Sequence, residues 1–248
     1  MPKLEHTKEG RELALSDRHV NMSNALVRAA QGLTLAEKRV MSSAVAKLDS
    51  VRHWTPEKLR VRLTAIDYAE TFGVDTDTAY NQLQAAADKL FHRYARWFEK
   101  GRRGPIEVKA HWVGSVKYYQ GEGWIELSFH HEMAPHLFML RKQFTGYKLA
   151  QASALRSIYS WRLLELLMQF KSKGELYITI EDFANAMDAP KSCRANFAQL
   201  RRRIIEPAVR ELGERDNLNV TWEPVKSGRR VKALSFAFEV EPQQRLDL

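Results

Sequence analysis

One stretch in the second half of the chain gathers side chains able to read DNA bases. Arginine can donate two hydrogen bonds to guanine O6 and N7, and glutamine can pair with adenine N6 and N7. At about 3.6 residues per turn, Leu200 and Ile204 share a helical face with Phe197. Gln199 and Arg202 fall on the opposite face. We predict that four residues contact base edges: Arg194, Gln199, Arg202 and Arg203.

Further basic residues are placed to contact the phosphate backbone. Lys191 and Ser192 lie at the predicted helix start, where free backbone N–H groups attract phosphate. Arg201 faces nearer the apolar side, so its stem should follow the protein surface before reaching a phosphate. Four more cations surround the glycine turn of the following hairpin: Lys226, Arg229, Arg230 and Lys232. A second basic segment adds four predicted backbone contacts: Lys100, Arg102, Arg103 and Lys109.

A helix-turn-helix followed by a hairpin would position these residues. Residues 154–171 have a helical pattern, residues 176–180 resemble a strand, and residues 181–187 resemble a short helix. A turn at Ala189–Pro190 precedes a longer helix that begins near Ser192. Because Pro207 lacks an N–H group, it is predicted to kink or end that helix. Strands at 219–225 and 231–240 then form the hairpin.

The first half of the chain repeats this order. A helix should start at Thr34, since Thr34 and Glu37 have the spacing of a capping box. A strand at 60–63, a short helix stopped by Gly73 and a helix at 76–91 follow, and strands are expected at 94–100, 106–119 and 124–129. Asp67-Tyr68-Ala69 matches Asp182-Phe183-Ala184 in the second half. The repeat predicts an α+β chain with two tandem winged-helix domains.

The expected domain limits follow from this repeat. They are a flexible N-terminal arm at 1–22, a first winged-helix domain at 23–131, a second at 132–242, and a tail at 243–248. In the first domain, Asp77 and Asp88 lie on the outward face of the helix that corresponds to the arginine-bearing one. Carboxylates repel phosphates, so we predict that the first domain does less base reading and that its basic segment, Lys100, Arg102, Arg103 and Lys109, contacts only the backbone.

Composition agrees with a polyanionic partner. The 248 residues include 39 Lys and Arg against 30 Asp and Glu, a net charge of +9. Between Lys191 and Lys232, eleven basic residues face five acidic ones. Cys193 is the single cysteine, so no internal disulfide can form, and no apolar run is long enough to span a membrane. The first twenty residues lack the apolar segment of a secretory signal, so we expect a cytoplasmic protein without a membrane partner.

The patterns in the sequence that resemble catalytic or metal-binding motifs are incomplete. His131 and His136 are five residues apart with a proline between them, whereas a zinc-protease motif needs histidines four apart. No phosphate-binding loop of the G-x-x-x-x-G-K-[ST] type occurs. Cys193 lies near a helix start, but no base partner is recognisable. We therefore expect no enzymatic activity, no cofactor and no metal.

Three segments resemble the replication initiators of iteron-containing, theta-replicating plasmids, the group that includes the F-plasmid initiator. They are LTLAEKRVMSSAVAKL (33–48), IDYAETFGV (66–74) and FAQLRRRIIEPAVRELGERDNLNVTWEPVKSGRRVKALSFAFE (197–239). The resemblance implies two winged-helix domains, with the C-terminal one reading directly repeated origin sites. It also implies that the N-terminal domain mediates dimerisation and contacts the DNA backbone.

Further functional expectations come from the same resemblance. Monomers of such initiators bind the repeats and help to open the origin, and dimers bind an inverted operator and repress the initiator gene. A host replication initiator, the replicative helicase and chaperones are implied as partners. Carried over here, base reading falls to the helix that holds Arg194, Gln199, Arg202 and Arg203.

Other interpretations remain open from the sequence. The run Arg201–Arg203 by itself also fits a solvated helix face. A chromosomal winged-helix transcription regulator would share the fold, and tandem repeats beside the gene would distinguish it from an initiator. A rolling-circle nicking enzyme would need a divalent metal and a nucleophilic tyrosine, but the adjacent His130 and His131 would point to opposite faces of a strand.

Overall fold

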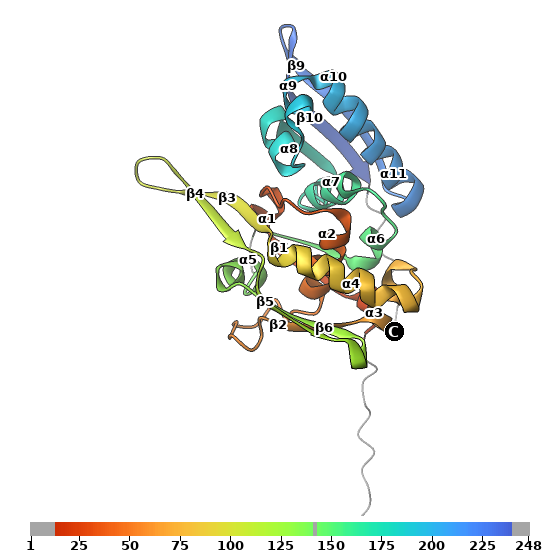
Figure 1. Cartoon of the computed structure of the whole chain (residues 1–248). Coiled ribbons are helices and arrows are strands. Elements are labelled where there is room, and N and C mark those ends of the chain that lie inside the picture. The colour runs from red at the N-terminus through yellow and green to blue at the C-terminus, as the bar shows by residue number, and fades with distance from the viewer. Residues whose placement is uncertain (1–12, 141–142, 240–248) are drawn as a thin grey trace, which may run out of the picture.

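The structure is a computed structural model, which describes residues 13–140 and 143–239. It holds two winged-helix units on either side of a small central layer (Figure 1). The first unit, residues 35–129, is built on a three-stranded antiparallel sheet in the order β2-β6-β5. Its elements are α2 (Leu35–Ala46), β2 (Arg60–Thr64), α3 (Ala65–Phe72), α4 (Thr76–Phe91), β3 (Tyr94–Lys100), β4 (Pro105–His111), β5 (Val113–Tyr119) and β6 (Trp124–Phe129).

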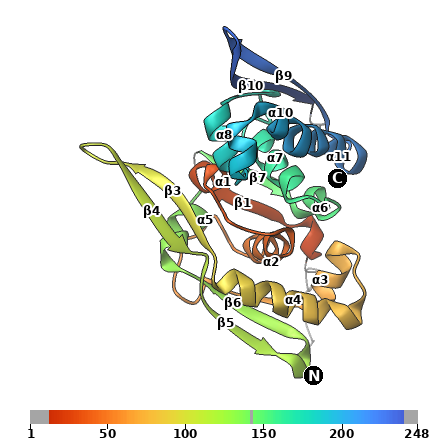
Figure 2. The ribbon, with the colours of Figure 1, turned by 45° about the horizontal axis from the view of Figure 1, so that its top comes forward.

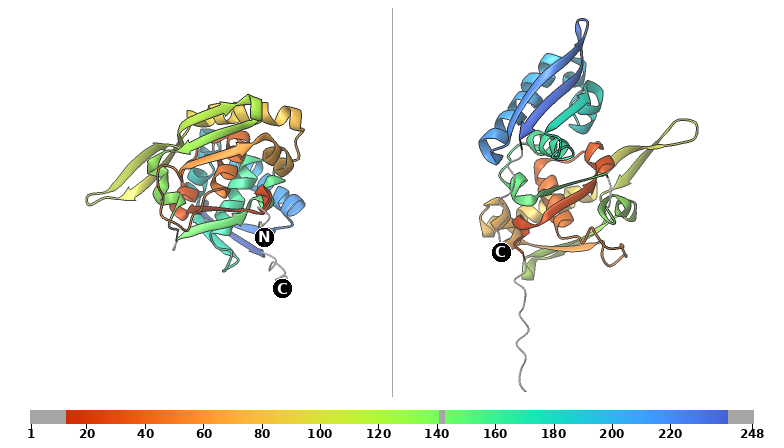
Figure 3. Two further views of the ribbon diagram at one scale, coloured as in Figure 1. Left: turned by 90° about the horizontal axis from the view of Figure 1, so that it is seen from below. Right: turned by 180° about the vertical axis from the view of Figure 1, so that it is seen from behind.

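The second unit, residues 158–239, repeats the first. Its sheet has the order β8-β10-β9, so in both units the last strand lies between the other two. Helices cover one face of this sheet, and the view from behind shows its other face (Figure 3). The expected α+β class with two tandem winged-helix units is confirmed. The elements are α7 (Ile158–Met168), β8 (Glu175–Thr179), α8 (Ile180–Ala186), α9 (Lys191–Ala195), α10 (Phe197–Leu200), a π-helical turn (Arg201–Ile205), α11 (Glu206–Asp216), β9 (Asn219–Ser227) and β10 (Arg230–Glu239).

The central layer joins the start of the chain to the segment between the units. Strand β1 (His19–Ser23) pairs antiparallel with β7 (Phe144–Lys148), and Val20 and Met22 are completely buried. Residues 19–22, expected within the N-terminal arm, are thus part of a sheet, whereas residues 1–12 and the expected tail lie outside the described residues. The boundary at 131/132 stays a prediction. The layer also contains α1 (Asn24–Arg28), α5 (Ala134–Leu137), α6 (Leu149–Ser153) and 3₁₀ turns at Leu15–Asp17 and His131–Met133, whereas the 3₁₀ turn Gln120–Glu122 joins β5 to β6 in the first unit.

Local sequence signals explain where the helices of the first unit begin and end. The Thr34 hydroxyl accepts the Glu37 N–H at 3.4 Å, and the Glu37 carboxylate accepts the Thr34 N–H at 2.9 Å. This is the predicted capping box, and such caps typically contribute about 1 kcal/mol. Gly73 ends α3 with a φ of 62°, a left-handed conformation that glycine adopts without a steric penalty. Asp75 caps α4, because its side-chain oxygen accepts the Asp77 N–H at 2.9 Å.

The predicted single helix from Ser192 is wrong in its first turns, because Asn196 interrupts it. Asn196 has an extended backbone, with φ −140° and ψ 110°, and separates α9 from α10. Its side-chain oxygen accepts the N–H groups of Ala198 at 2.9 Å and Gln199 at 3.3 Å. Asparagine is a preferred N-cap residue for this reason. A short helix therefore precedes the long one.

Pro207 does not end the long helix, which was one of the two predicted effects, and the predicted kink stays a prediction. The helix continues to Asp216, and a π-helical turn stands just before the proline. In this turn the Glu206 N–H donates to the Arg201 carbonyl, five residues back. The wider turn places Pro207 in the first turn of α11, where a missing N–H costs least.

Candidate nucleic-acid interface

The recognition segment, residues 191–205, buries one face and exposes arginines on the other. Leu200 and Ile204 are 0% and 1% exposed, so they anchor the segment in the core of the second unit. Arg202 and Arg203 are exposed, and within the described residues neither guanidinium makes a hydrogen bond or ion pair. Their donors are thus available to an external acceptor, as base reading requires.

The other two predicted base-reading residues are already engaged with the protein. Arg194 donates from Nε to the Ala189 carbonyl at 2.7 Å, and from Nη1 to the Asn185 side chain. These bonds hold α9 against the end of α8. Gln199 is half-buried, and its Oε1 is buried with no hydrogen-bond partner among the described residues. A base contact by either residue stays a prediction, and Arg194 would have to exchange bonds to make one.

Arg201 follows the protein surface, as its position relative to the apolar face predicted. Its Nε lies 2.7 Å from the Glu206 carboxylate, and its guanidinium stands 5.9 Å from the centre of the Trp222 ring on β9. The ion pair offsets the charge, and the aromatic contact fixes the side chain near the base of the hairpin. A contact between Arg201 and a phosphate stays a prediction.

The β9–β10 hairpin is the wing of the second unit. Gly228 turns the chain with a φ of 61°, in the left-handed region that suits glycine. Lys226, Arg229 and Arg230 are all exposed around this turn. Exposed cations on a projecting hairpin attract phosphates without reading sequence.

Lys232 is set apart from the other wing cations by a β-bulge. The pairing register shifts between Val231 and Ala233, which leaves Lys232 as the extra residue. A bulge redirects a side chain, and Lys232 here lines an open pocket of about 620 Å³ with Arg194 and Tyr177. Tyr177 is 64% exposed.

The first turn of α9 is also exposed. It carries Lys191 and Ser192, the two residues at the helix start that are predicted to contact phosphate.

The second basic segment forms an arm. Strands β3 and β4 form a separate two-stranded sheet, in register from Tyr94↔His111 to Lys100↔Pro105. This arm and the wing project from the body on either side of α8 (Figures 1 and 2). Arg102 and Arg103 are exposed at the arm tip. Two further exposed lysines stand along its strands, Lys100 and Lys109.

The corresponding surface of the first unit is acidic. Asp77 and Asp88 are exposed on α4, as the outward positions predicted. Asp77, Glu122 and the 60% exposed Ile66 line a pocket at the start of α4. A face of this charge does not favour the phosphate backbone.

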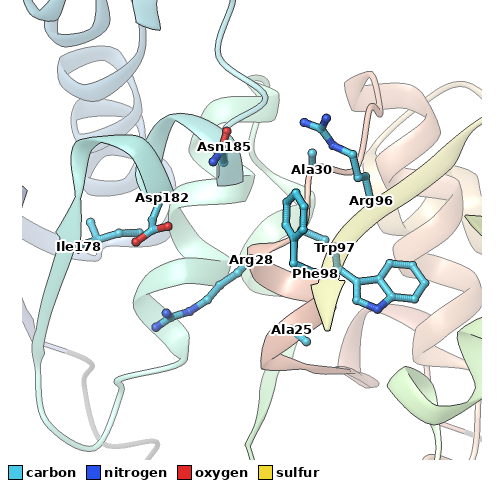
Figure 4. Close-up of a pocket in the computed structure, with 10 residues that line it drawn as sticks. Ala25, Arg28, Ala30, Arg96, Trp97, Phe98, Ile178, Asp182 and Asn185 are labelled. Atoms are coloured by element: carbon cyan, nitrogen blue, oxygen red, sulfur yellow. The ribbon is translucent and has the colours of Figure 1, made fainter. Parts of the chain in front are cut away.

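Two arginines, one at the end of α1 and one on the arm, were not among the predicted contact residues. Arg28 at the end of α1 and Arg96 on β3 line a pocket of about 290 Å³ between the two units, and Asp182 and Asn185 of α8 line its other side (Figure 4). Arg28 donates to the Gln169 side chain at 2.9 Å. These residues are far apart in the chain, and no local pattern indicates that the fold brings them together.

His136 and Cys193, which the sequence offered for metal binding and nucleophilic chemistry, contact other residues of the fold. The Nδ1 atom of His136 lies 2.7 Å from the Ser23 hydroxyl. The His136 ring packs edge-on against Trp97, and burial lowers the pKa of His136. Cys193 is buried. Among residues 13–140 and 143–239, no three His, Cys, Asp or Glu side chains group as metal ligands. Over the same ranges no helix has the length and apolarity required to cross a membrane.

The chain is similar in sequence to proteins of Escherichia coli and in fold to a solved structure. An uncharacterized 27.6 kDa protein of Escherichia coli is 27% identical over 222 residues, covering 85% of this chain and 91% of that protein. A replication initiation protein of Escherichia coli is 25% identical over 242 residues, covering 94% of this chain and 73% of that protein. The crystal structure of the Pi initiator protein in complex with iteron DNA matches with a TM-score of 0.77 over 91% of this chain and 98% of that chain, at 21% identity. At that identity the match shows a shared fold.

Two family models cover most of the chain. One, described as Initiator Replication protein, WH1, matches residues 19–168. The other, described as Initiator Rep protein, WH2, matches residues 179–238. The order of these two models is the order of the two winged-helix units in the structure. The chain therefore belongs to the family of initiator replication proteins.

Proposed function

We propose that this chain initiates plasmid replication by binding directly repeated sites, iterons, in the double-stranded DNA of an origin. The observation that carries the proposal is that Arg202 and Arg203 are exposed and make no hydrogen bond or ion pair with any described residue, on a segment whose opposite face is anchored in the core. The membership of the family and the shared fold with an initiator that was crystallised on iteron DNA support it.

In this proposal the two units divide the contacts. The recognition segment lies in a major groove, where four residues contact bases: Arg194, Gln199, Arg202 and Arg203. The wing and the segment ends bind phosphate through Lys191, Ser192, Arg201, Lys226, Arg229, Arg230 and Lys232. The arm of the first unit adds backbone contacts through Lys100, Arg102, Arg103 and Lys109. The acidic face of α4 leaves base reading to the second unit.

Regulation and partners belong to the same proposal. A monomer binds the iterons and helps to open the origin, and a homodimer binds an inverted operator and represses the gene of the chain. A host initiator, the replicative helicase and chaperones are the proposed protein partners in the bacterial cytoplasm. The chain acts by binding, without catalysis, cofactor or metal.

The test is a footprint on origin DNA. In the DNA beside the reading frame, tandem repeats of about 20 base pairs, close to two helical turns, are expected. The wild-type chain should protect these repeats. Arg202→Ala with Arg203→Ala should lower the preference for the repeat over unrelated DNA by about tenfold or more, since each good base contact contributes roughly 1–3 kcal/mol of discrimination.

A matched control removes two cations far from the proposed interface. Arg52 pairs with Asp49, and Lys58 donates to the His53 carbonyl, in the loop that precedes β2. Arg52→Ala with Lys58→Ala changes the net charge equally and should keep the footprint. An unchanged footprint in the Arg202 and Arg203 variant, with a normal thermal transition, would overturn the assignment of the recognition segment.

A further inference from the structure

The turn of the helix-turn-helix in the second unit is fastened to a loop of the first half of the chain. This coupling loop, residues 29–34, connects α1 to α2. The Asp188 carboxylate, in the turn between α8 and α9, accepts the N–H groups of Gln31 at 2.9 Å and Gly32 at 3.0 Å. Asp188 has a φ of 48°, an uncommon conformation for a residue other than glycine. The turn therefore holds its carboxylate on the coupling loop.

A buried arginine makes a second connection at the same place. Arg162 of α7 is 2% exposed, and its guanidinium donates to the Ala186 carbonyl at the end of α8 at 2.7 Å. It also donates to the carbonyls of Val27 at 2.7 Å and Ala29 at 2.8 Å. One rigid guanidinium thus ties the end of α8 to the start of the coupling loop.

The coupling loop is also joined to the arm. Ala30 and Arg96 form an isolated antiparallel bridge, in which Ala30 N–H donates to Arg96 O at 3.2 Å and Arg96 N–H donates to Ala30 O at 2.9 Å. In Figure 4, Ala30 and Arg96 lie on one side of the inter-unit pocket and Asn185 lies on the other. The Trp112 indole N–H donates to the Gln31 carbonyl at 3.2 Å. The coupling loop is therefore hydrogen-bonded at Ala30 to the arm and at Gln31 and Gly32 to the turn before the recognition segment.

We propose that the coupling loop sets the spacing between the arm and the recognition segment on DNA, and that Asp188 is the positioning residue of this connection. The proposal rests on the function proposed above, because it needs both contacts to fall on one DNA site. A fixed spacing means that the major-groove contact and the arm contact must be a set number of base pairs apart. The chain then measures the length of its site as well as reading its bases.

Asp188 can be replaced without creating a cavity in the core, because it is exposed. Arg162 is buried, so its replacement would remove the donor that the carbonyls of Val27, Ala29 and Ala186 share. Asp188 is exposed, and its backbone conformation suits glycine. Asp188→Gly therefore removes the carboxylate and relieves the backbone strain. Asp188→Asn keeps a side-chain oxygen that can accept the same two N–H groups, which makes it the matched control.

The experiment measures spacing tolerance with the full chain. The probes are a duplex that holds one origin repeat and a series of the same duplex with one base pair inserted at successive positions. One inserted base pair increases the distance along the helix axis between the two contact sites by about 3.4 Å. Wild type and Asp188→Asn should lose about tenfold in affinity at insertions between the two footprints, as expected when one group of contacts is broken. Asp188→Gly should lose less than about threefold there, since the turn before the recognition segment is then no longer held on the coupling loop.

Each outcome separates this inference from the function on which it rests. If the wild-type chain does not prefer the repeat to unrelated DNA, the proposed function fails, whatever the variants do. If it prefers the repeat but Asp188→Gly shows the same insertion penalty with a normal thermal transition, only the coupling is overturned. A uniform loss across all the duplexes would show a general structural role and would equally overturn it. Relief confined to insertions between the footprints supports the positioning role.

Discussion

Lys38 of α2 and Glu165 of α7 form an ion pair, with 2.6 Å between Nζ and Oε1 and both side chains completely buried. Glu165 also accepts hydrogen bonds from Arg162 at 2.8 Å and from the Tyr147 hydroxyl at 2.9 Å. Burial lowers the pKa of Lys38 to about 8, and Glu165 opposes this shift. Two cations therefore share one carboxylate between the first helices of the two units.

The loss of this carboxylate should destabilise the chain more than the loss of the lysine. Glu165→Gln leaves Lys38 and Arg162 buried without a counter-charge, which should lower the free energy of unfolding by about 3–5 kcal/mol. Lys38→Met leaves the Arg162–Glu165 pair balanced and should cost less than half as much. Urea denaturation of both variants at pH 7 measures the difference, and equal losses would contradict the shared-carboxylate arrangement.

Asp216 should make the stability of the chain depend on pH. It lies at the end of α11, and its Oδ2 has no hydrogen-bond partner within the described residues. Burial raises the pKa of Asp216 from 3.8 to about 7. The unfolded chain releases this proton near pH 4 and the folded chain keeps it to about pH 7, so the free energy of unfolding falls as the pH rises through that window.

Asp216→Asn should remove this pH dependence. Because the side chain is partly exposed, the gain at pH 8 relative to the wild type should be modest, about 1–2 kcal/mol. At pH 3.5 the Asp216 side chain is neutral in the folded and largely neutral in the unfolded wild-type chain. The free energies of unfolding of the variant and the wild type should therefore nearly coincide at this pH. Urea denaturation at pH 3.5, 5 and 8 checks this, and a constant offset between the two chains would contradict the assignment.

Removal of wing cations should weaken binding to every DNA sequence alike. Lys226→Ala with Arg229→Ala removes two exposed charges at the turn of the β9–β10 hairpin. The slope of log Kd against log salt should become shallower by about 2, close to one for each lost phosphate contact. The ratio of affinities for repeat and unrelated DNA should stay constant. Titration at several salt concentrations measures both, and a loss confined to the repeat would place these residues on bases instead.

The chain should leave supercoiled origin DNA intact. His130 and His131 lie with ring centres 4.3 Å apart, and His131 contacts Glu132 at 3.3 Å. Tyr118 and Tyr119 lie on β5 of the first unit, away from the recognition segment. Incubation with magnesium should yield neither relaxed DNA nor a covalent adduct, with a nicking endonuclease as the positive control. Either product would favour the nicking-enzyme interpretation.

Much of the architecture was predictable from local signals. Thr34 and Glu37 form the expected capping box, and Gly73 ends α3 where its position in the pattern predicted. Leu200 and Ile204 are buried opposite Arg202, as helical spacing required. Asn196 was a readable cap signal that the apolar periodicity around it concealed. The π-helical turn before Pro207, which places the proline in the first turn of α11, was not predicted from the sequence.

The amino-acid sequence by itself determined the repeated winged-helix order, the excess of positive charge and the face of the recognition segment that carries arginines, since periodicity and charge are local properties of a chain. Only the tertiary structure decided that Arg194 is held by Asn185 and Ala189, that β1 pairs with β7, and that Asp188 bonds to the loop at Gln31 and Gly32. These contacts join residues that no repeat or motif relates. Their partners are selected by how the two units pack, and that packing is a property of the whole chain.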